Sequence, residues 1–308
     1  MKAVMIKKYG GPESVSVEDV PQPKPKVGEV LIRVYATSIN PVDWKLREGM
    51  MKDFPLPFTP GGDFSGVIED VGRGVAGFSK GQEVYGCTPR NIGSDAEYLT
   101  VLASNIAAKP KSLDHNEAAS VPLAAMTAWQ ALFEHGKLSK GQKVLILGGS
   151  GGVGNFAIQF AMAWGASVYA TAATENVDTV RDLGVDGVID YKNQKVEEAV
   201  EDADLCVDLV GGEFARRALS CLKEGGTMIS AVQPPDQRTA SSKGLQGHMI
   251  VMQPNAEHLR EIARLIDRGT VKVRVAKVLP LDRAAEAEEL NHRHEVEGKI
   301  VLQVRSGD

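Results

Sequence analysis

The chain has 308 residues, of which 43% are hydrophobic and 24% charged, and its formal net charge is -5 at pH 7. The composition is typical of a globular protein, and the length favours two domains because a single core stops growing near about 250–300 residues. The acidic balance predicts no nucleic-acid partner and no anionic membrane surface. No apolar run reaches the roughly 18–20 residues that cross a bilayer. Residues 1–10 lack the apolar core of a signal peptide, so we expect a cytoplasmic protein.

The first part of the chain has short β-rich runs separated by Gly and Pro, which predict strands. They are residues 2–7, 14–20, 29–36, 64–71, 83–87 and 97–103. The proline-rich run 21–28 predicts a stiff connector. Further β-rich runs at 271–278 and 299–304 flank a helical stretch at 284–290, and we expect this tail to rejoin the first domain.

From about residue 116, strand and helix signals alternate. The expected helices are 116–135, interrupted by Pro122, and 153–164, 213–222 and 255–267, whereas the polar run 234–247 predicts a surface loop. The expected strands are 143–147, 167–172, 187–190, 205–210, 227–231 and 248–252. These strands are short and almost wholly apolar, as strands covered on both faces must be. The alternation predicts an α/β domain with a doubly wound parallel sheet of six strands.

A glycine-rich turn follows the first of these strands. Gly149, Gly151 and Gly154 satisfy G-x-G-x-x-G between an apolar strand and a helix, which is the context that makes this pattern specific. Glycines let the backbone approach a pyrophosphate, and the helix N-terminus supplies free N–H groups. The residues expected to bind the dinucleotide here are Ser150, Gly151, Gly152, Val153 and Gly154. Ligands gather at the carboxyl edge of such sheets, which adds Val210, Gly211, Ser230 and Ala231.

The strand end after residue 172 bears on the choice between NAD and NADP. An acid about 20 positions beyond the glycine turn binds ribose hydroxyls in NAD enzymes, and Glu175 lies near that distance. Thr174, however, is expected to be the N-cap of the next helix, which would make Glu175 a helix-stabilising acid. Thr171 and Thr174 leave room for a phosphate but supply no cation. Both cofactors therefore stay open on these residues.

Five separated motifs occur in the order of one family: 40–45 (Asn-Pro-Val-Asp-Trp-Lys), 60–66, 118–129, the glycine turn and 298–302. The chain resembles the zinc-independent quinone oxidoreductase and enone reductase branch of the medium-chain dehydrogenase/reductase superfamily, over essentially its whole length. The resemblance implies a GroES-like β-barrel catalytic domain at 1–118 and 270–308 and a Rossmann domain at 119–269. It also implies hydride transfer from NADPH to a quinone or enone, and a homodimer. It adds Thr127, Thr174, Tyr191 and Lys299 as cofactor-binding residues.

The positions of the zinc ligands in related enzymes are occupied by other residues. Zinc-dependent relatives place a cysteine where Asn40 stands and a His-Glu pair where Gly62 and Asp63 stand. The three cysteines, Cys87, Cys206 and Cys221, fit neither a disulfide framework nor a CxxC site, and we expect them to be buried. Without a Lewis acid an alcohol loses its usual activation, whereas a quinone or enone is already electron-poor. The resemblance thus implies a reductase without metal. A cofactor-binding protein with little turnover, like the lens-crystallin relatives, is the alternative.

Residues 40–45 are expected to form a loop that faces nicotinamide and substrate. The resemblance gives Asn40 and Asp43 catalytic roles, and it places Lys45 near a substrate carbonyl, where it would stabilise enolate charge or donate a proton. A structural turn for Asn40 and Asp43 and a solvated Lys45 remain open alternatives. His292 and His294 are expected to be solvated or to cap a helix.

Overall fold

The computed structural model describes residues 1–51, 54–89 and 92–306. It divides into two compact units, Met1–Leu123 with Gln253–Asp308, and Ala124–Met252. The sequence predicts domain boundaries at 118/119 and 269/270, which would put α9 (Ala256–Asp267) in the second domain. In the structure, α9 belongs to the first unit. The reason is direct bonding: the Tyr85 hydroxyl donates to the Leu259 carbonyl at 2.5 Å, and the Ser112 hydroxyl donates to Asp267 at 2.9 Å.

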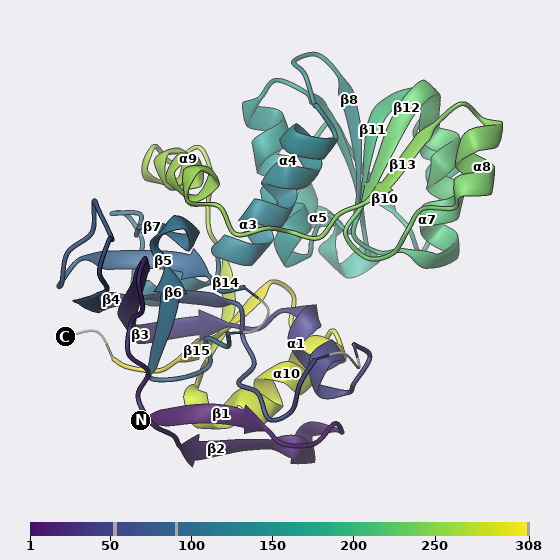
Figure 1. The fold of residues 1–308 in the computed structure, drawn as a ribbon. Helices are drawn as coiled ribbons and strands as arrows, with labels where there is room; N and C mark the ends of the chain where they lie inside the picture. Colours follow the sequence, from purple (N-terminus) through teal and green to yellow (C-terminus); the bar gives the residue numbers. More distant parts are fainter. Residues whose placement is uncertain (52–53, 90–91, 307–308) are drawn as a thin grey trace. The chain divides into compact units, whose positions relative to one another are not determined.

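The first unit is built on a seven-stranded mixed sheet and a separate hairpin (Figure 1). The sheet contains β14 (Val275–Pro280), β15 (Lys299–Gln303), β3 (Glu29–Ser38), β4 (Asp63–Val71), β5 (Glu83–Cys87) and β7 (Ile106–Ala108) in that order, and β6 (Tyr98–Leu102) pairs with β3. The hairpin is β1 (Lys2–Ile6) with β2 (Val15–Asp19). Tail strand β15 runs antiparallel to β3, with Val301 opposite Ser38. Alternate residues of β3, Val30, Ile32 and Val34, are fully buried and form the core of this sheet.

The helices of the first unit include α1 (Pro41–Arg47), α2 (His115–Ala119) and α10 (Ala284–His292). The expectation of a loop at 40–45 was wrong, because Asn40 is the N-cap of α1. The Asn40 N–H donates to Asp43 Oδ2 at 2.7 Å within a capping box. Proline at the first helical position and an acid at the third are helix-start signals, and the same residues also favour a turn.

The second unit is a six-stranded sheet in which every pairing is parallel, as expected. Its order is β10 (Gly187–Asp190), β9 (Ser167–Ala172), β8 (Lys143–Leu147), β11 (Ala203–Asp208), β12 (Leu222–Ser230) and β13 (Gln246–Met249). Figure 1 shows α4 (Gly152–Ala163) on one side of this sheet and α7 (Gly212–Ala218) with α8 (Gln237–Ser242) on the other. Val144 to Leu147 are fully buried because both faces of β8 are covered.

Two segments differ from the sequence expectation. Residues 234–247 contain α8, because the Asp236 carboxylate caps it by accepting from Arg238 N at 3.0 Å and Thr239 N at 3.1 Å. The stretch 116–135 is interrupted before Pro122, as expected, into α2 and α3 (Pro122–Trp129), but it ends in a π-helix at Gln130–His135 that was not expected. The remaining helices are α5 (Val177–Arg181) and α6 (Val196–Ala199), with 3₁₀ turns at Pro12–Ser14, Ala103–Asn105, Thr174–Asn176, Leu219–Cys221 and Leu281–Arg283.

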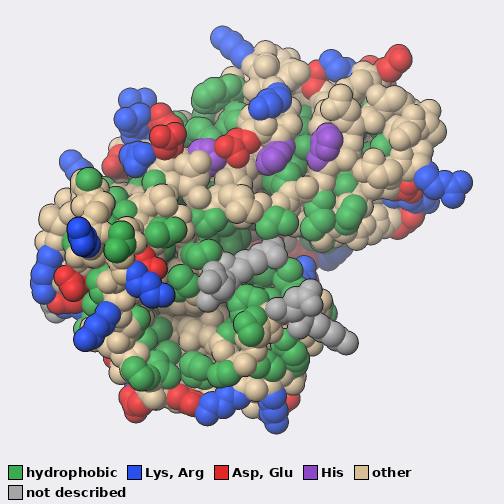
Figure 2. All heavy atoms as spheres, viewed as in Figure 1, with side chains coloured by type: hydrophobic (Ala, Val, Ile, Leu, Met, Phe, Trp, Pro, Cys, Tyr) green, Lys and Arg blue, Asp and Glu red, His purple; other side chains and the backbone are tan. Residues whose placement is uncertain are grey.

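The surface carries charges of both signs. On the face that Figure 2 shows, basic and acidic side chains of the described residues are interspersed rather than gathered by sign. Within the described ranges, none of the helices has the length and apolar character needed to cross a membrane.

Two glycines of the glycine turn have different surroundings, which gives a matched pair of substitutions. A Cβ at Gly154 would lie 2.1 Å from the Gly148 carbonyl oxygen, whereas a Cβ at Gly151 would have no atom nearer than 3.5 Å. We expect Gly154→Ala to lower the free energy of unfolding by about 3 kcal/mol through overpacking and Gly151→Ala to lower it by about 0.5 kcal/mol. Urea unfolding measures both, and equal effects would contradict the packing.

Candidate functional site

The glycine turn is held in place by the neighbouring strand. Gly148 N donates to Thr171 Oγ1 at 3.0 Å, and Gly149 N donates to the Thr171 carbonyl at 2.8 Å. Gly148 has a φ of +85°, a left-handed conformation that favours glycine. Thr171 was expected to bind cofactor. The structure gives it a role in fixing the turn, because its buried hydroxyl already has a backbone partner.

Helix α4 begins immediately after this turn. Gly151 is its N-cap, and no side chain of the described residues caps this end. The first-turn N–H groups of Gly152, Val153 and Gly154 therefore require an acceptor from outside the helix, and the helix dipole favours an anion there. The space above Gly151 is open, and Ser150 is only half-buried. These features fit the pyrophosphate of a dinucleotide.

The ends of β11 and β12 are joined by Asp208, a residue buried at the carboxyl edge of the sheet. Its Oδ1 accepts from Val210 N at 3.0 Å and Gly211 N at 2.8 Å, and its Oδ2 accepts from the Ser230 hydroxyl at 2.7 Å. The Ala231 N–H donates to the Asp208 carbonyl at 3.0 Å. Four expected cofactor residues thus bond to one residue, Asp208, three of them to its carboxylate and Ala231 to its backbone carbonyl. A cavity of about 270 Å³ lies beside it, lined by Gly212, Arg216 and Gln233 among others.

The segments that follow β9 and β10 form an ion pair that the sequence did not predict. Lys192 Nζ lies 2.8 Å from both carboxylate oxygens of Glu175. The Tyr191 ring packs against the Phe214 ring at a centroid distance of 5.9 Å. Thr174 is the first residue of a 3₁₀ turn whose N-cap is Ala173, so the expectation that Thr174 caps a helix was wrong. The sequence feature that could have indicated this pair is the position of Lys192, two residues after β10, the strand that pairs with β9.

In the first unit, the expected catalytic residue Asn40 is the centre of a buried polar network. The Lys299 ammonium donates to Asn40 Oδ1 at 2.7 Å, to the Ile39 carbonyl at 3.0 Å and to Asp63 Oδ2 at 3.2 Å. Asn40 Nδ2 donates to the same Asp63 oxygen at 2.8 Å and to the Ser38 carbonyl at 3.3 Å. All three Lys299 protons therefore have acceptors within this unit. The structure gives Lys299 the task of fixing Asn40, and a contact with cofactor stays a prediction.

Two further buried carboxyls lie near this network, and sequence reasoning missed Asp95. Burial, followed by the Asp95 carboxylate, raises the pKa of Asp43 to about 8. Burial also raises the pKa of Asp95 to about 7, opposed by a hydrogen bond from the Thr37 hydroxyl at 2.8 Å. Asp95 Oδ2 has no partner among the described residues. The raised pKa values of Asp43 and Asp95 let the folded protein hold protons near neutral pH.

Helix α1 is fixed against α10 on its other side. Arg47 and Glu288 are fully buried, with Arg47 Nε 3.3 Å from Glu288 Oε2, and burial raises the pKa of Glu288 well above its usual range. The Trp44 ring stacks on His292 at a centroid distance of 4.2 Å, and its Nε1 donates to Asn291 Oδ1 at 3.1 Å. His292 is thus a packing residue as well as a partly exposed one.

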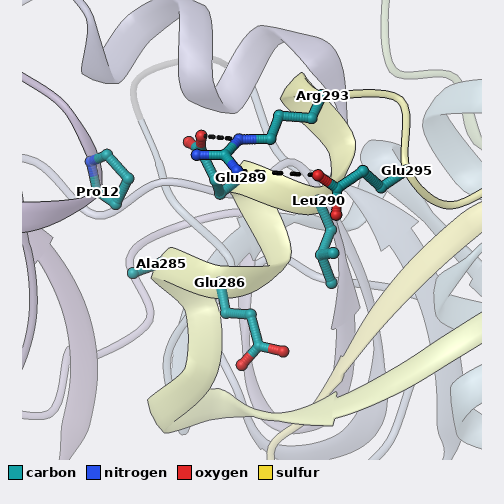
Figure 3. A pocket seen from close by; sticks show the side chains of 7 residues that line it. All are labelled: Pro12, Ala285, Glu286, Glu289, Leu290, Arg293 and Glu295. Carbon is teal, nitrogen blue, oxygen red and sulfur yellow. Dashed lines mark hydrogen bonds and ion pairs between the residues drawn. The ribbon is translucent and has the colours of Figure 1, made fainter.

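Lys45 and Thr127 were also expected at the site. The Lys45 side chain is half-buried, and its ammonium lies 5.4 Å from the Trp44 ring centroid. Thr127 is buried on α3. A separate cavity of about 300 Å³ lies between α10 and Pro12 (Figure 3). Arg293, which lines it, is already paired with Glu289 at 2.6 Å. We therefore take as candidate sites the glycine turn with the neighbouring sheet edge in the second unit, and the Asn40 network with Lys45 in the first unit.

The three cysteines are free and buried, as expected. Among residues 1–51, 54–89 and 92–306, no three His, Cys, Asp or Glu side chains form a group suited to hold a metal ion. The Asn40 carboxamide is bonded to an ammonium and a carboxylate instead.

Comparisons with known proteins agree with this architecture. The alcohol dehydrogenase GroES-like domain family matches residues 26–111, and the zinc-binding dehydrogenase family matches residues 183–302. An NADPH-dependent alkenal/one oxidoreductase from Arabidopsis thaliana chloroplasts is 36% identical, over 98% of this chain and 79% of that protein.

Solved structures extend the similarity to the whole fold. The quinone oxidoreductase of Coxiella burnetii has a TM-score of 0.93 and 32% identity, with 99% of each chain covered. The Escherichia coli quinone oxidoreductase, solved with NADPH, has a TM-score of 0.90 and 25% identity, over 99% of this chain and 100% of that one. The chain belongs to the zinc-independent quinone oxidoreductase and enone reductase branch of the medium-chain dehydrogenase/reductase superfamily.

The buried carboxyls predict how stability depends on pH. Because the folded-state pKa values of Asp43 and Asp95 are raised, the folded protein binds more protons than the unfolded one between about pH 4 and their pKa values of about 8 and 7. Stability should therefore fall as pH rises through this window, by up to about 1.4 kcal/mol per pH unit for each group. Urea midpoints of the wild type and Asp95→Asn between pH 5 and 9 measure this.

The Asp95→Asn variant should show a shallower fall with pH than the wild type. Asp282→Asn, which removes an exposed carboxylate of the same unit, should leave the slope unchanged. A wild-type midpoint that rises over this range would contradict the assignment.

Proposed function

We propose that this protein is an NADPH-dependent reductase of quinones or α,β-unsaturated carbonyls that acts without zinc. The proposal rests on the hydrogen bonds of the Asn40 carboxamide, which accepts from Lys299 and donates to Asp63. Asn40 stands where zinc-dependent relatives place a cysteine, and an amide bonded to an ammonium is a poor replacement for a thiolate ligand. The names of the relatives, an alkenal/one oxidoreductase and quinone oxidoreductases, support the substrate class.

The residues of the second unit fit a nicotinamide dinucleotide. The uncapped N-terminus of α4 offers N–H groups to the pyrophosphate, and the absence of a side chain at Gly151 leaves room for it. Val210, Gly211, Ser230 and Ala231 would line the bound cofactor further along the sheet edge. When bound, reduced nicotinamide supplies a hydride. We favour NADPH because the E. coli relative was solved with NADPH.

The residues of the first unit divide into two roles. Reduction of an enone adds hydride at the β-carbon and a proton at the α-carbon, and negative charge develops on the carbonyl oxygen between these steps. We assign Lys45 to that oxygen, because this residue is partly exposed and a cation stabilises the charge. Asn40 and Asp43 are positioning residues, since both N–H groups of the Asn40 amide already have acceptors inside the unit.

We also infer a homodimer and a cytoplasmic location. β13 is an edge strand of its sheet, and Met249 and Val251 at its end are each 45% exposed, which favours pairing with a second copy. Three free cysteines suit a reducing compartment. Light scattering tests the first inference, and a monomer at micromolar concentration would contradict it. Cell fractionation tests the second, and recovery in an organelle would contradict it.

Turnover with a panel of quinones and enones tests the proposed reaction. We expect NADPH oxidation by at least one acceptor class, with Lys45→Met lowering kcat about 100-fold through loss of charge stabilisation. Cofactor affinity should be unchanged, and Lys45→Arg should restore part of the rate. Lys8→Met, which removes an exposed lysine of the same unit, is the matched control. Tight NADPH binding with no turnover on any acceptor would contradict the proposal.

A further inference from the structure

We propose that the Glu175–Lys192 ion pair sets the choice between NADPH and NADH, with Lys192 as the cation for the 2′-phosphate and Glu175 as its internal competitor. The inference rests on the proposed function and adds a specificity mechanism to it. In this mechanism, a bound 2′-phosphate displaces Glu175 as the partner of Lys192. When the cofactor has no such phosphate, Glu175 accepts hydrogen bonds from the ribose hydroxyls.

The location of the pair follows from the sheet register. β10 runs parallel to β9 with Asp190 opposite Ala172, and Tyr191 N donates to the Ala172 carbonyl at 3.1 Å. The residues after the two strands therefore lie side by side, although 17 positions separate Glu175 from Lys192. In a dinucleotide-binding sheet, the adenosine ribose lies at the carboxyl end of the second strand, which is β9 here. The pair is thus within the region that distinguishes the two cofactors.

The pair is accessible and exchangeable. Its side chains are 62% exposed at Glu175 and 48% exposed at Lys192, so water and salt screen their attraction. A phosphate carries more negative charge than a carboxylate and offers three acceptor oxygens, so it competes well for the ammonium. The Lys192 ammonium holds the pKa of Glu175 below its usual range, so the competitor is charged at neutral pH.

A second carboxylate limits the preference for phosphate. Asp190 is fixed in the same turn, where Oδ1 accepts from Lys192 N at 3.0 Å and Oδ2 accepts from Asn193 Nδ2 at 2.8 Å. The same Asn193 amide donates to the Thr174 hydroxyl at 3.2 Å. A phosphate here meets one ammonium and two carboxylates. We therefore expect both cofactors to bind, with a preference for NADPH of about tenfold or less that declines with ionic strength.

Calorimetric binding of four probes tests the mechanism apart from catalysis. The probes are 2′,5′-ADP, 5′-AMP, NADPH and NADH, and the proteins are the wild type, Lys192→Ala and Glu175→Gln. Lys192→Ala should weaken 2′,5′-ADP about tenfold and leave 5′-AMP within about twofold. Glu175→Gln should strengthen 2′,5′-ADP about fivefold and weaken 5′-AMP and NADH, because it removes the competitor and the ribose acceptor.

Lys195→Ala is the matched control. Lys195 is a 63% exposed lysine three positions away that pairs with Glu198, so its loss changes the net charge by the same amount without touching the proposed phosphate site. If Lys192→Ala weakens both adenosine probes equally, or Lys195→Ala has the same effect, the mechanism is overturned. If the wild type binds neither dinucleotide, the proposed function fails. Binding of both dinucleotides with no selective shift in the variants overturns the specificity mechanism alone.

Discussion

The Lys299 ammonium is buried where three segments of the first unit meet, and it has an acceptor for each of its protons. It comes from tail strand β15, and its acceptors come from the end of β3, from Asn40 and from Asp63 at the start of β4. A buried charge is costly unless it is paired and hydrogen-bonded. Loss of this ammonium would leave the buried Asp63 carboxylate without its cation and would remove the donor to Asn40 Oδ1, at a cost of about 3–5 kcal/mol. The position of α1 depends on this arrangement.

The same network links structure to chemistry. Asn40 is both a member of the network and the N-cap of α1, so the helix that carries Lys45 begins at a fixed point. The buried Arg47–Glu288 pair holds the opposite end of α1. The second unit differs, because its glycine turn presents backbone N–H groups that no side chain of the described residues caps. In the proposed function, the second unit binds phosphate through these N–H groups, and the first unit holds its polar groups in a rigid buried network.

Much of this was predictable from the sequence, and the exceptions have physical causes. The parallel sheet and the glycine turn were predictable because apolar strands and glycine spacing are local signals. The network around Lys299 was not, since Lys299 and Asn40 are 259 positions apart and no local pattern records their contact. The Glu175–Lys192 pair was missed for a similar reason, because Lys192 follows β10 and approaches Glu175 only through the pairing of β10 with β9. The α1 and α8 starts were misjudged because capping residues also favour turns.

In the proposed function, this chain transfers a hydride from a nicotinamide to an electron-poor acceptor. The most direct measurement is mass spectrometry of the product formed from an enone with NADPH that carries deuterium at the transferable C4 position of the nicotinamide. We expect one deuterium on the carbon β to the carbonyl and a solvent-derived proton on the α-carbon. A reduced product without that deuterium, or label at the carbonyl carbon of an alcohol product, would contradict it.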